Sequence, residues 1–126
     1  MEKSLTNTKE LYWRAFLKTQ DYNKATQISN SIFEVLKSCS LISCKPYWKD
    51  STLYELEFRQ KLKENESSKI IIEVFSIIVL FSNTWKIDIP TFYNAEDFEL
   101  SGLVKDNINH NGISWISFVM QNICVR

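Results

Sequence analysis

The stretch from Thr52 to Arg59 alternates between apolar and charged residues, and this period of two constrains the fold more than any other feature of the chain. Its apolar members Tyr54, Leu56 and Phe58 are each followed by a charged residue. Successive side chains of a strand point to opposite faces, so the pattern predicts a strand with one buried and one solvated face. The buried face of such a sheet must be covered by another layer, and helices are the expected cover.

Two helices are expected before this strand. The first spans about Thr8 to Thr19, because Asn7 and Glu10 resemble a capping box and the apolar residues that follow recur at helical spacing. The second begins at Tyr22, and its apolar residues recur at steps of three and four: Tyr22, Ala25, Ile28, Ile32, Val35, Leu36 and Cys39. The stretch from Ser38 to Ser51 contains a proline and several serines, which predicts a connection.

The segment from Ile70 to Phe81 carries two conflicting patterns. Most of its residues are β-branched, which favours a buried strand. Its polar residues are spaced as one narrow stripe on a helix: Glu66, Lys69, Glu73 and Ser76. The segment is longer than a typical strand, so we favour a mostly buried helix, and a strand remains the alternative.

Three more strands are predicted in the C-terminal half. The first runs from Trp85 to Ile89, and the next runs from Phe98 to Val104 with a bulge expected at Gly102. The residues between these strands, Thr91 to Asp97, are expected to form a loop. The last strand, Ile113 to Met120, is apolar on both faces and is therefore expected in the interior of the sheet.

Together these elements predict one α+β domain over residues 1–126. Its expected core is a mainly antiparallel sheet of about four strands, with an N-terminal helical pair and one further buried helix. The chain has 126 residues, which is the size of one ordinary domain. With 44% hydrophobic residues and two glycines, it is not expected to be disordered.

Charge and cysteine content limit the expected partners and compartment. The chain has 15 basic and 15 acidic residues, and this balance disfavours nucleic acid as a partner. The charge is uneven, because residues 1–63 carry a net +4 and residues 64–126 a net −4.

Three cysteines without a disulfide-scaffold spacing are typical of a reducing compartment. The chain has no recognisable secretory signal and no apolar run long enough to span a bilayer, so we expect a cytoplasmic protein without a membrane partner.

The sequence predicts no catalytic, cofactor or metal site. His110 is the single histidine, which excludes the common catalytic zinc sets, and its polar setting is typical of a turn. A Ser-His or Cys-His pair built on it is the less favoured alternative. Cys39 and Cys44 lack a zinc-knuckle spacing, and two glycines cannot form a glycine-rich phosphate loop. We therefore expect a protein that is not an enzyme and needs no cofactor.

An acidic stretch between Asp88 and Asp106 is the feature with the clearest functional interpretation. It contains five carboxylates and two aromatic residues, which are Asp88, Glu96, Asp97, Glu99, Asp106, Phe92 and Tyr93. Acidic side chains speed the encounter with a basic partner and set its register, while Tyr and Phe supply buried contact area. We predict these seven residues as a partner-binding set. A solvated loop is the alternative.

The C-terminal half resembles small immunity proteins of bacterial contact-dependent growth inhibition and related polymorphic toxin systems. The resemblance lies in Trp85-Lys86-Ile87-Asp88-Ile89-Pro90, the acidic loop after it, and Gly112-Ile113-Ser114-Trp115-Ile116-Ser117-Phe118. It implies a cytoplasmic protein, expected as a monomer rather than a dimer, that binds a cognate toxin domain and neutralises it. It also implies a nuclease as the toxin, with its active site or substrate access blocked. An acidic patch could then take the place of the phosphate backbone.

A secretion chaperone is the alternative from another class. Such a protein is also small, α+β and cytoplasmic, and it would form a dimer that holds an effector segment. A stable dimer with an exposed apolar groove would favour the chaperone over the immunity protein.

Overall fold

A six-stranded antiparallel sheet forms the centre of the protein, and the computed structural model describes residues 9–88, 91–93 and 98–122. These residues form, in chain order, β1 (Lys9–Leu17), α2 (Tyr22–Val35), β2 (Cys39–Pro46), β3 (Tyr54–Lys61), α3 (Ser67–Ile78), β4 (Lys86–Ile87), β5 (Thr91–Phe92), β6 (Phe98–Glu99), β7 (Ser101–Val104) and β8 (Ile113–Asn122). The strand order in the main sheet is β2-β3-β1-β8-β7-β4, and every neighbouring pair is antiparallel. β5 and β6 pair separately as a two-stranded sheet.

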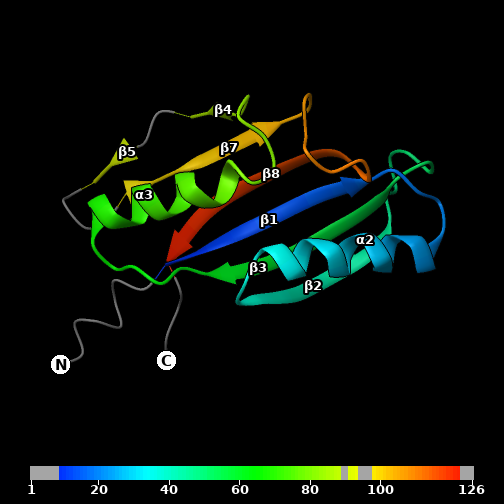
Figure 1. The fold of residues 1–126 in the computed structure, drawn as a ribbon, viewed down its shortest axis with the longest axis horizontal. Coiled ribbons are helices and arrows are strands. Elements are labelled where there is room, and N and C mark those ends of the chain that lie inside the picture. The colour runs from blue at the N-terminus through cyan, green and yellow to red at the C-terminus, as the bar shows by residue number, and fades with distance from the viewer. Residues whose placement is uncertain (1–8, 89–90, 94–97, 123–126) are drawn as a thin grey trace.

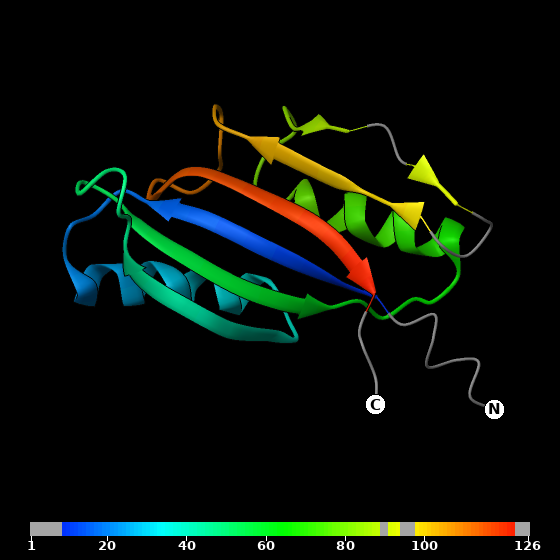
Figure 2. The same cartoon turned by 180° about the vertical axis from the view of Figure 1, so that it is seen from behind.

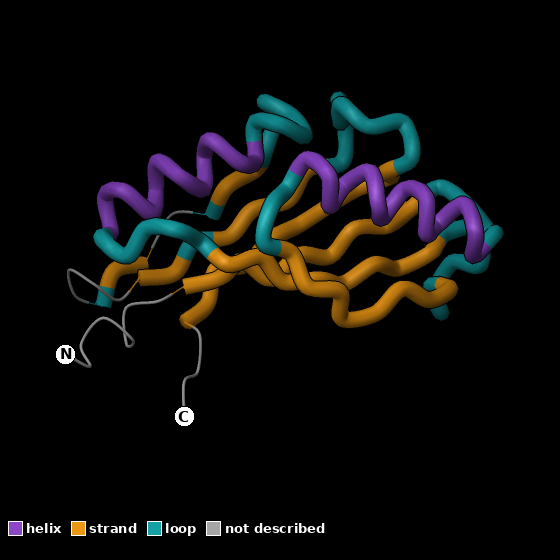
Figure 3. The backbone as a smooth tube through the Cα atoms, turned by 60° about the horizontal axis from the view of Figure 1, so that its bottom comes forward, coloured by secondary structure: helices purple, strands orange, loops and turns teal. Residues whose placement is uncertain are grey.

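Both helices of the described residues lie on the same face of the main sheet, as Figures 1 and 3 show. α2 packs over β2 and β3, where Phe33 meets Phe58 with ring centroids 5.1 Å apart. Seen from behind, the strands stand in front of the helices (Figure 2). We call the face of the sheet opposite to the helices the open face.

The predicted fold class is wrong in its numbers of strands and helices. The expected architecture of about four strands and three helices is wrong, because the described residues form six strands in the main sheet, two more in the small sheet, and two helices. The helix expected from Tyr22, the strand expected from Thr52 and the strand from Ile113 are all present. The conflict over Ile70 to Phe81 is resolved for the helix, since α3 covers most of that segment.

The helix expected over Thr8 to Thr19 is wrong, because residues 9–17 form β1. Leu11, Tyr12, Ala15 and Phe16 have helical spacing, but Leu11, Trp13, Ala15 and Leu17 also have strand spacing. The strand buries the second set completely on the helix-covered face, whereas Tyr12 is only half-buried. β1 is also hydrogen-bonded to a neighbour along both edges, and sequence periodicity contains no information about such long-range pairing.

The connection expected from Ser38 to Ser51 is also wrong in part, since Cys39 to Pro46 form β2. β2 is an edge strand, and most of its side chains are exposed or half-buried. Its register on β3 shifts between Leu41 and Ser43, so the alternation is broken by a bulge. An exposed, bulged edge strand leaves little apolar pattern for sequence analysis to detect.

The predicted strand from Phe98 to Val104 is divided at Leu100 into β6 and β7. Part of the expected 91–97 loop is strand β5, and residues 94–97 lie outside the described residues. The bulge expected at Gly102 is wrong, because Gly102 pairs regularly with both Ile87 and Phe118. A Cβ atom at Gly102 would lie 2.7 Å from Cδ1 of Ile87 and 2.8 Å from Cε1 of Phe118. Glycine is therefore required here by close packing.

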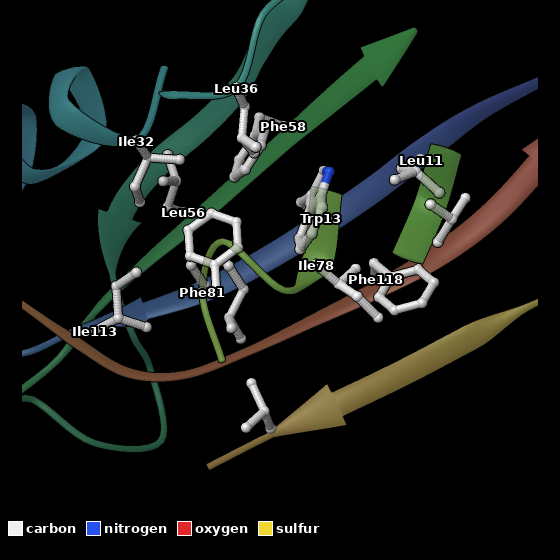
Figure 4. Packing of buried hydrophobic residues seen from close by; sticks show 14 of the residues in the cluster. Leu11, Trp13, Ile32, Leu36, Leu56, Phe58, Ile78, Phe81, Ile113 and Phe118 are labelled. Carbon is white, nitrogen blue, oxygen red and sulfur yellow. The ribbon is translucent and has the colours of Figure 1, made fainter. Parts of the chain in front are cut away.

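The core lies between the sheet and the two helices. Trp13 lies at its centre, as Figure 4 shows, with ring centroids 5.8 Å from Phe58 and 5.7 Å from Phe118. Its indole N–H donates to Oε1 of Gln60 at 3.0 Å, so the buried polar atom is satisfied. The helices contribute Ile32 and Leu36 on one side and residues such as Ile78 on the other.

Candidate functional site

The open face carries most of the polar side chains of the sheet. Directly paired residues of antiparallel strands point to the same face, so the strand register gives the rows across this face. One row contains Ser101, Val119, Tyr12, Arg59 and Ser40. The next row contains Leu103, Ser117, Arg14, Glu57 and Ser43. Residues far apart in the sequence thus form one continuous surface.

An ion-pair network lies near the middle of the open face. The guanidinium of Arg14 donates to Oε2 of Glu55 at 2.5 Å from Nη2 and 3.1 Å from Nε, and its Nε lies 3.8 Å from Oε2 of Glu57. The hydroxyl of Tyr12 donates to the same Glu57 oxygen at 2.6 Å, and Ser43 donates to the other at 3.1 Å. Burial lowers the pKa of the Arg14 guanidinium, but the hydrogen bond and charge of Glu55, together with Tyr12 and Glu57, raise it more, so the net shift is upward.

The same network shifts the pKa values of two of its members in opposite directions. Burial, together with the hydrogen bond and charge of Glu57, raises the pKa of Tyr12 from 10.0 to about 12. The hydrogen bond from Tyr12 lowers the pKa of Glu57 despite its partial burial, and Ser43 and Arg14 act in the same direction. Both shifts favour a neutral phenol that donates to a charged carboxylate at neutral pH.

Alkaline titration should reveal the network through Tyr12. Because its folded pKa of about 12 lies above the ordinary value of 10.0, its stabilising effect is complete below pH 10.0 and is lost as the pH rises towards 12. We expect the tyrosinate absorbance of the wild type minus that of Tyr12→Phe to rise with a midpoint near pH 12. A difference curve with its midpoint at the ordinary tyrosine value of about 10 would contradict the hydrogen bond to Glu57.

Aromatic side chains form a second cluster at one end of the open face. Phe16 is fully buried although it points away from the helices, because Trp115 stacks on it at 4.0 Å and Tyr47 meets it edge-on at 4.6 Å between ring centroids. The guanidinium of Arg14 lies 5.2 Å from the Phe16 ring centroid and joins this cluster to the ion-pair network. Rigid Trp, Tyr and Arg side chains are the types that most often anchor protein partners.

A groove at the other end of the open face contains part of the predicted partner-binding set. It has a volume of about 700 Å³ and lies between β6, the start of β7 and the C-terminal half of β8. Its walls include Tyr93, Glu99, Ser101, Val119 and Gln121. The hydroxyl of Tyr93 donates to Oε2 of Glu99 at 2.9 Å, which fixes the two side chains relative to each other. We call this hollow the acidic groove.

Asp88 lies at the border of the acidic groove. Its Oδ2 accepts from the hydroxyl of Ser101 at 2.8 Å, and its backbone N–H donates to the carbonyl of Ser101 at 3.0 Å. Phe92 is 54% exposed and stacks on Phe98, with ring centroids 5.0 Å apart. The consecutive short strands β4, β5 and β6 therefore bring Asp88, Tyr93 and Glu99 to one end of the sheet, while Phe92 shares the face of β5 and β6 that carries Phe98.

The other predicted partner-binding residues do not join this group. Asp106 follows the C-terminal end of β7, whereas Glu99 precedes its N-terminal end, so β7 separates the two carboxylates. Glu96 and Asp97 lie outside the described residues. Sequence analysis did not predict Val119 and Gln121 as groove residues, because their position depends on the pairing of β8 with β7 and β1. The alternation along β8 could have indicated that they share a face with Trp115 and Ser117.

His110 takes part in a hydrogen-bonded clasp between α2 and the turn before β8. Its Nδ1 accepts from the backbone N–H of Gly112 at 3.0 Å, so the proton of the neutral ring is on Nε2, which lies 2.8 Å from the hydroxyl of Ser31. Ser31 in turn donates to the carbonyl of Ile28 at 2.7 Å. In this arrangement Nε2 is a donor and cannot take a proton from Ser31, so the pair is a structural contact rather than an activated nucleophile.

Two of the cysteines are described, and both are half-buried. Burial raises the pKa of Cys39 to about 11 and also raises that of Cys44, so both thiols are held in the unreactive protonated form.

Among the described residues, no three His, Cys, Asp or Glu side chains are grouped closely enough to hold a metal ion. Neither helix in the described part of the chain is long and apolar enough to cross a bilayer. Comparison of the chain with protein-family models, curated proteins and solved structures gives no match.

Proposed function

We propose that this protein is a cytoplasmic immunity protein that binds a cognate toxin domain and blocks its active site or substrate access. The acidic groove carries the proposal, since Tyr93 and Glu99 of the predicted partner-binding set line this hollow and Asp88 lies at its border, bonded to Ser101. The resemblance of the C-terminal half to immunity proteins supplies the class of partner. No catalytic role for the protein itself is part of this proposal.

The chemistry of the acidic groove suits a basic side chain of the partner. Glu99 in its wall and Asp88 at its border supply negative charge, and the exposed Tyr93 can cover the aliphatic stem of a lysine or arginine. Val119 is also exposed and offers apolar contact area beside Gln121. A toxin that binds nucleic acid would present such basic side chains in its substrate groove, and occupying that groove would exclude its substrate.

The rest of the open face offers the area that a stable complex requires. Protein interfaces of standard size bury about 1,600 Å² in total. Three groups follow one another across the open face: the acidic groove, the ion-pair network around Arg14, and the aromatic cluster of Phe16, Trp115 and Tyr47. The rows of paired residues connect them. We propose that the acidic groove guides the encounter and that the half-buried aromatic residues contribute most of the affinity.

Charge reversal at the acidic groove tests this proposal. We predict that the adjacent upstream gene encodes the C-terminal end of a very large secreted protein, and that domain is the proposed partner to co-express with this protein before size exclusion. We expect a tight one-to-one complex, and Asp88→Lys combined with Glu99→Lys should slow association at low salt by about tenfold or more, because the attraction becomes repulsion. Stopped-flow fluorescence measures the association rate.

Glu34→Lys is the matched control for this experiment. Glu34 is exposed on α2, on the opposite side of the sheet, so its reversal should leave the association rate nearly unchanged. Failure to form a complex would reject the proposed toxin as the partner. Equal rates for the double variant and the wild type would reject the acidic groove as the docking surface.

The secretion chaperone remains a second candidate because α3 exposes an apolar outer face. Ile72 and Phe75 in α3 and Val79 and Leu80 directly after it are all more than two-fifths exposed, and together they form an exposed apolar patch. A chaperone of this type would form a stable dimer. Light scattering distinguishes the two candidates, because the immunity protein is proposed to be a monomer in the absence of its partner.

A further inference from the structure

A second hollow lies on the helix-covered side of the molecule, on the far side of the sheet from the open face. It has a volume of about 430 Å³ and is bounded by the C-terminal end of α2, the link between β3 and α3, and one flank of α3. Figure 3 shows the two helices one after the other above the sheet. The residues that line the hollow come from the C-terminal end of α2 and from α3. We call it the interhelical groove.

The floor of the interhelical groove is apolar. Val35 and Leu36 form its α2 side, and Ile72, Ile77 and Leu80 form its α3 side. Ile72 is 66% exposed, and Val35 and Leu80 are also exposed. A partner that covers these side chains would be stabilised in the complex, because the contact removes their apolar surface from water.

The rim of the interhelical groove is positively charged. Four exposed lysines line it, which are Lys37, Lys61, Lys63 and Lys69. Its acidic residues are Glu64 and Glu73. The carboxylate of Glu73 accepts three hydrogen bonds from the backbone N–H groups of Lys63 and Glu64, at 2.9 to 3.1 Å, and so it holds the β3–α3 link in place. The rim therefore favours a negatively charged occupant.

The shape of the interhelical groove favours a protein segment over a flat surface. The lining residues run from Lys69 in α3 to Leu80 in the turn that follows it, and a rise of about 1.5 Å per residue makes this flank about 16 Å long. An amphipathic helix of about three turns could lay its apolar face along such a flank. A bilayer would contact the outer ridge of α3 and leave the concave floor unfilled.

We propose that the interhelical groove is a docking site for an acidic amphipathic helix of another protein. The apolar face of that helix packs on Ile72, Ile77 and Leu80. Its carboxylates pair with Lys37, Lys61 and Lys63 of the rim, since Lys69 already forms an ion pair with Glu66. This site is separate from the acidic groove and has the opposite charge, so the protein can hold two surfaces of one partner or two different partners. The proposal does not depend on the toxin-binding function.

A pair of synthetic peptides tests the proposal. Both have about 16 residues and leucines along one helical face, and the other face carries glutamates in one peptide and lysines in its counterpart. Titration of each into the full-length, isotopically labelled protein is followed by amide chemical shifts. We expect the acidic peptide to bind about tenfold or more tightly than the basic one and to shift the amides of residues 35–38, 60–64 and 69–80. Equal binding of the two peptides, or shifts elsewhere, would overturn the proposal.

Two variants of α3 locate the binding site further. Ile72→Glu places a carboxylate on the groove floor and should lower the affinity for the acidic peptide by about tenfold or more. Val79→Glu is the matched control, because Val79 is 52% exposed on the same helix but does not line the groove. Equal loss in both variants would contradict docking in the groove. Vesicles of mixed phosphatidylcholine and phosphatidylserine form a third arm, and binding to them in preference to the acidic peptide would also overturn the proposal.

Discussion

Replacing Trp13 by alanine is expected to lower the free energy of unfolding by about 4 kcal/mol. Trp13 is fully buried in β1, and its ring also contacts Phe81 and Trp85, with centroids 5.5 Å and 6.2 Å away. The substitution leaves a cavity between sheet and helices, and it removes the indole donor from the buried Gln60. Both effects destabilise the folded state.

Trp48→Ala is the matched control for this prediction. Trp48 is 79% exposed in the link between β2 and β3, and its ring lies 5.1 Å from the Lys49 ammonium. Its replacement should change the unfolding free energy by about 0.5 kcal/mol or less. Urea unfolding followed by circular dichroism measures both variants. Similar losses in the two variants would contradict the position of β1 at the centre of the core.

Replacing Arg14 by methionine is expected to destabilise the protein by about 3 kcal/mol. The side chain of Glu55 is only 7% exposed and receives two hydrogen bonds from Arg14. Without the guanidinium, Glu55 retains a nearly buried charge that has lost its main partner. The loss of unfolding free energy should therefore be much larger than the net contribution of the intact ion pair to stability.

A double-mutant cycle separates these two quantities. Arg14→Met combined with Glu55→Met removes both charges, and we expect its stability to lie close to that of the wild type. Lys69→Met is the control, because Lys69 and Glu66 form an exposed pair 4.0 Å apart that should contribute less than about 0.5 kcal/mol. An Arg14→Met loss as small as that of Lys69→Met would contradict the role of Arg14 as the partner of the nearly buried Glu55 carboxylate.

Elements with one dominant local pattern were predicted from the sequence, and elements that depend on long-range pairing were not. β3 alternates cleanly, and α2 has an apolar stripe and a cap from Asp21, which accepts from the Lys24 N–H at 3.0 Å. β1 satisfies both helical and strand periods, and only its pairing with β3 and β8 decides between them. β2 has almost no pattern because it is a bulged edge strand.

The candidate site shows the same division. The acidic composition around Glu99 was visible in the sequence, and so were the aromatic residues Phe92 and Tyr93. Their arrangement beside Val119 could not be derived, because it requires the register of β7 on β8. Asp106 was included because it is close in sequence, but β7 carries it to the opposite end of the strand. Sequence distance is a poor guide to spatial distance along an extended strand.

Mapping the interface of the complex by amide chemical shifts tests the central claim most directly. The isotopically labelled protein is mixed with the unlabelled toxin domain, and the shifts are compared with those of the free protein. We predict the largest changes at Tyr93, at Glu99 to Ser101 and at Val119 to Asn122, which line the acidic groove. Changes confined to α2 and α3, with none at these residues, would contradict the claim that the protein binds its partner through the acidic groove.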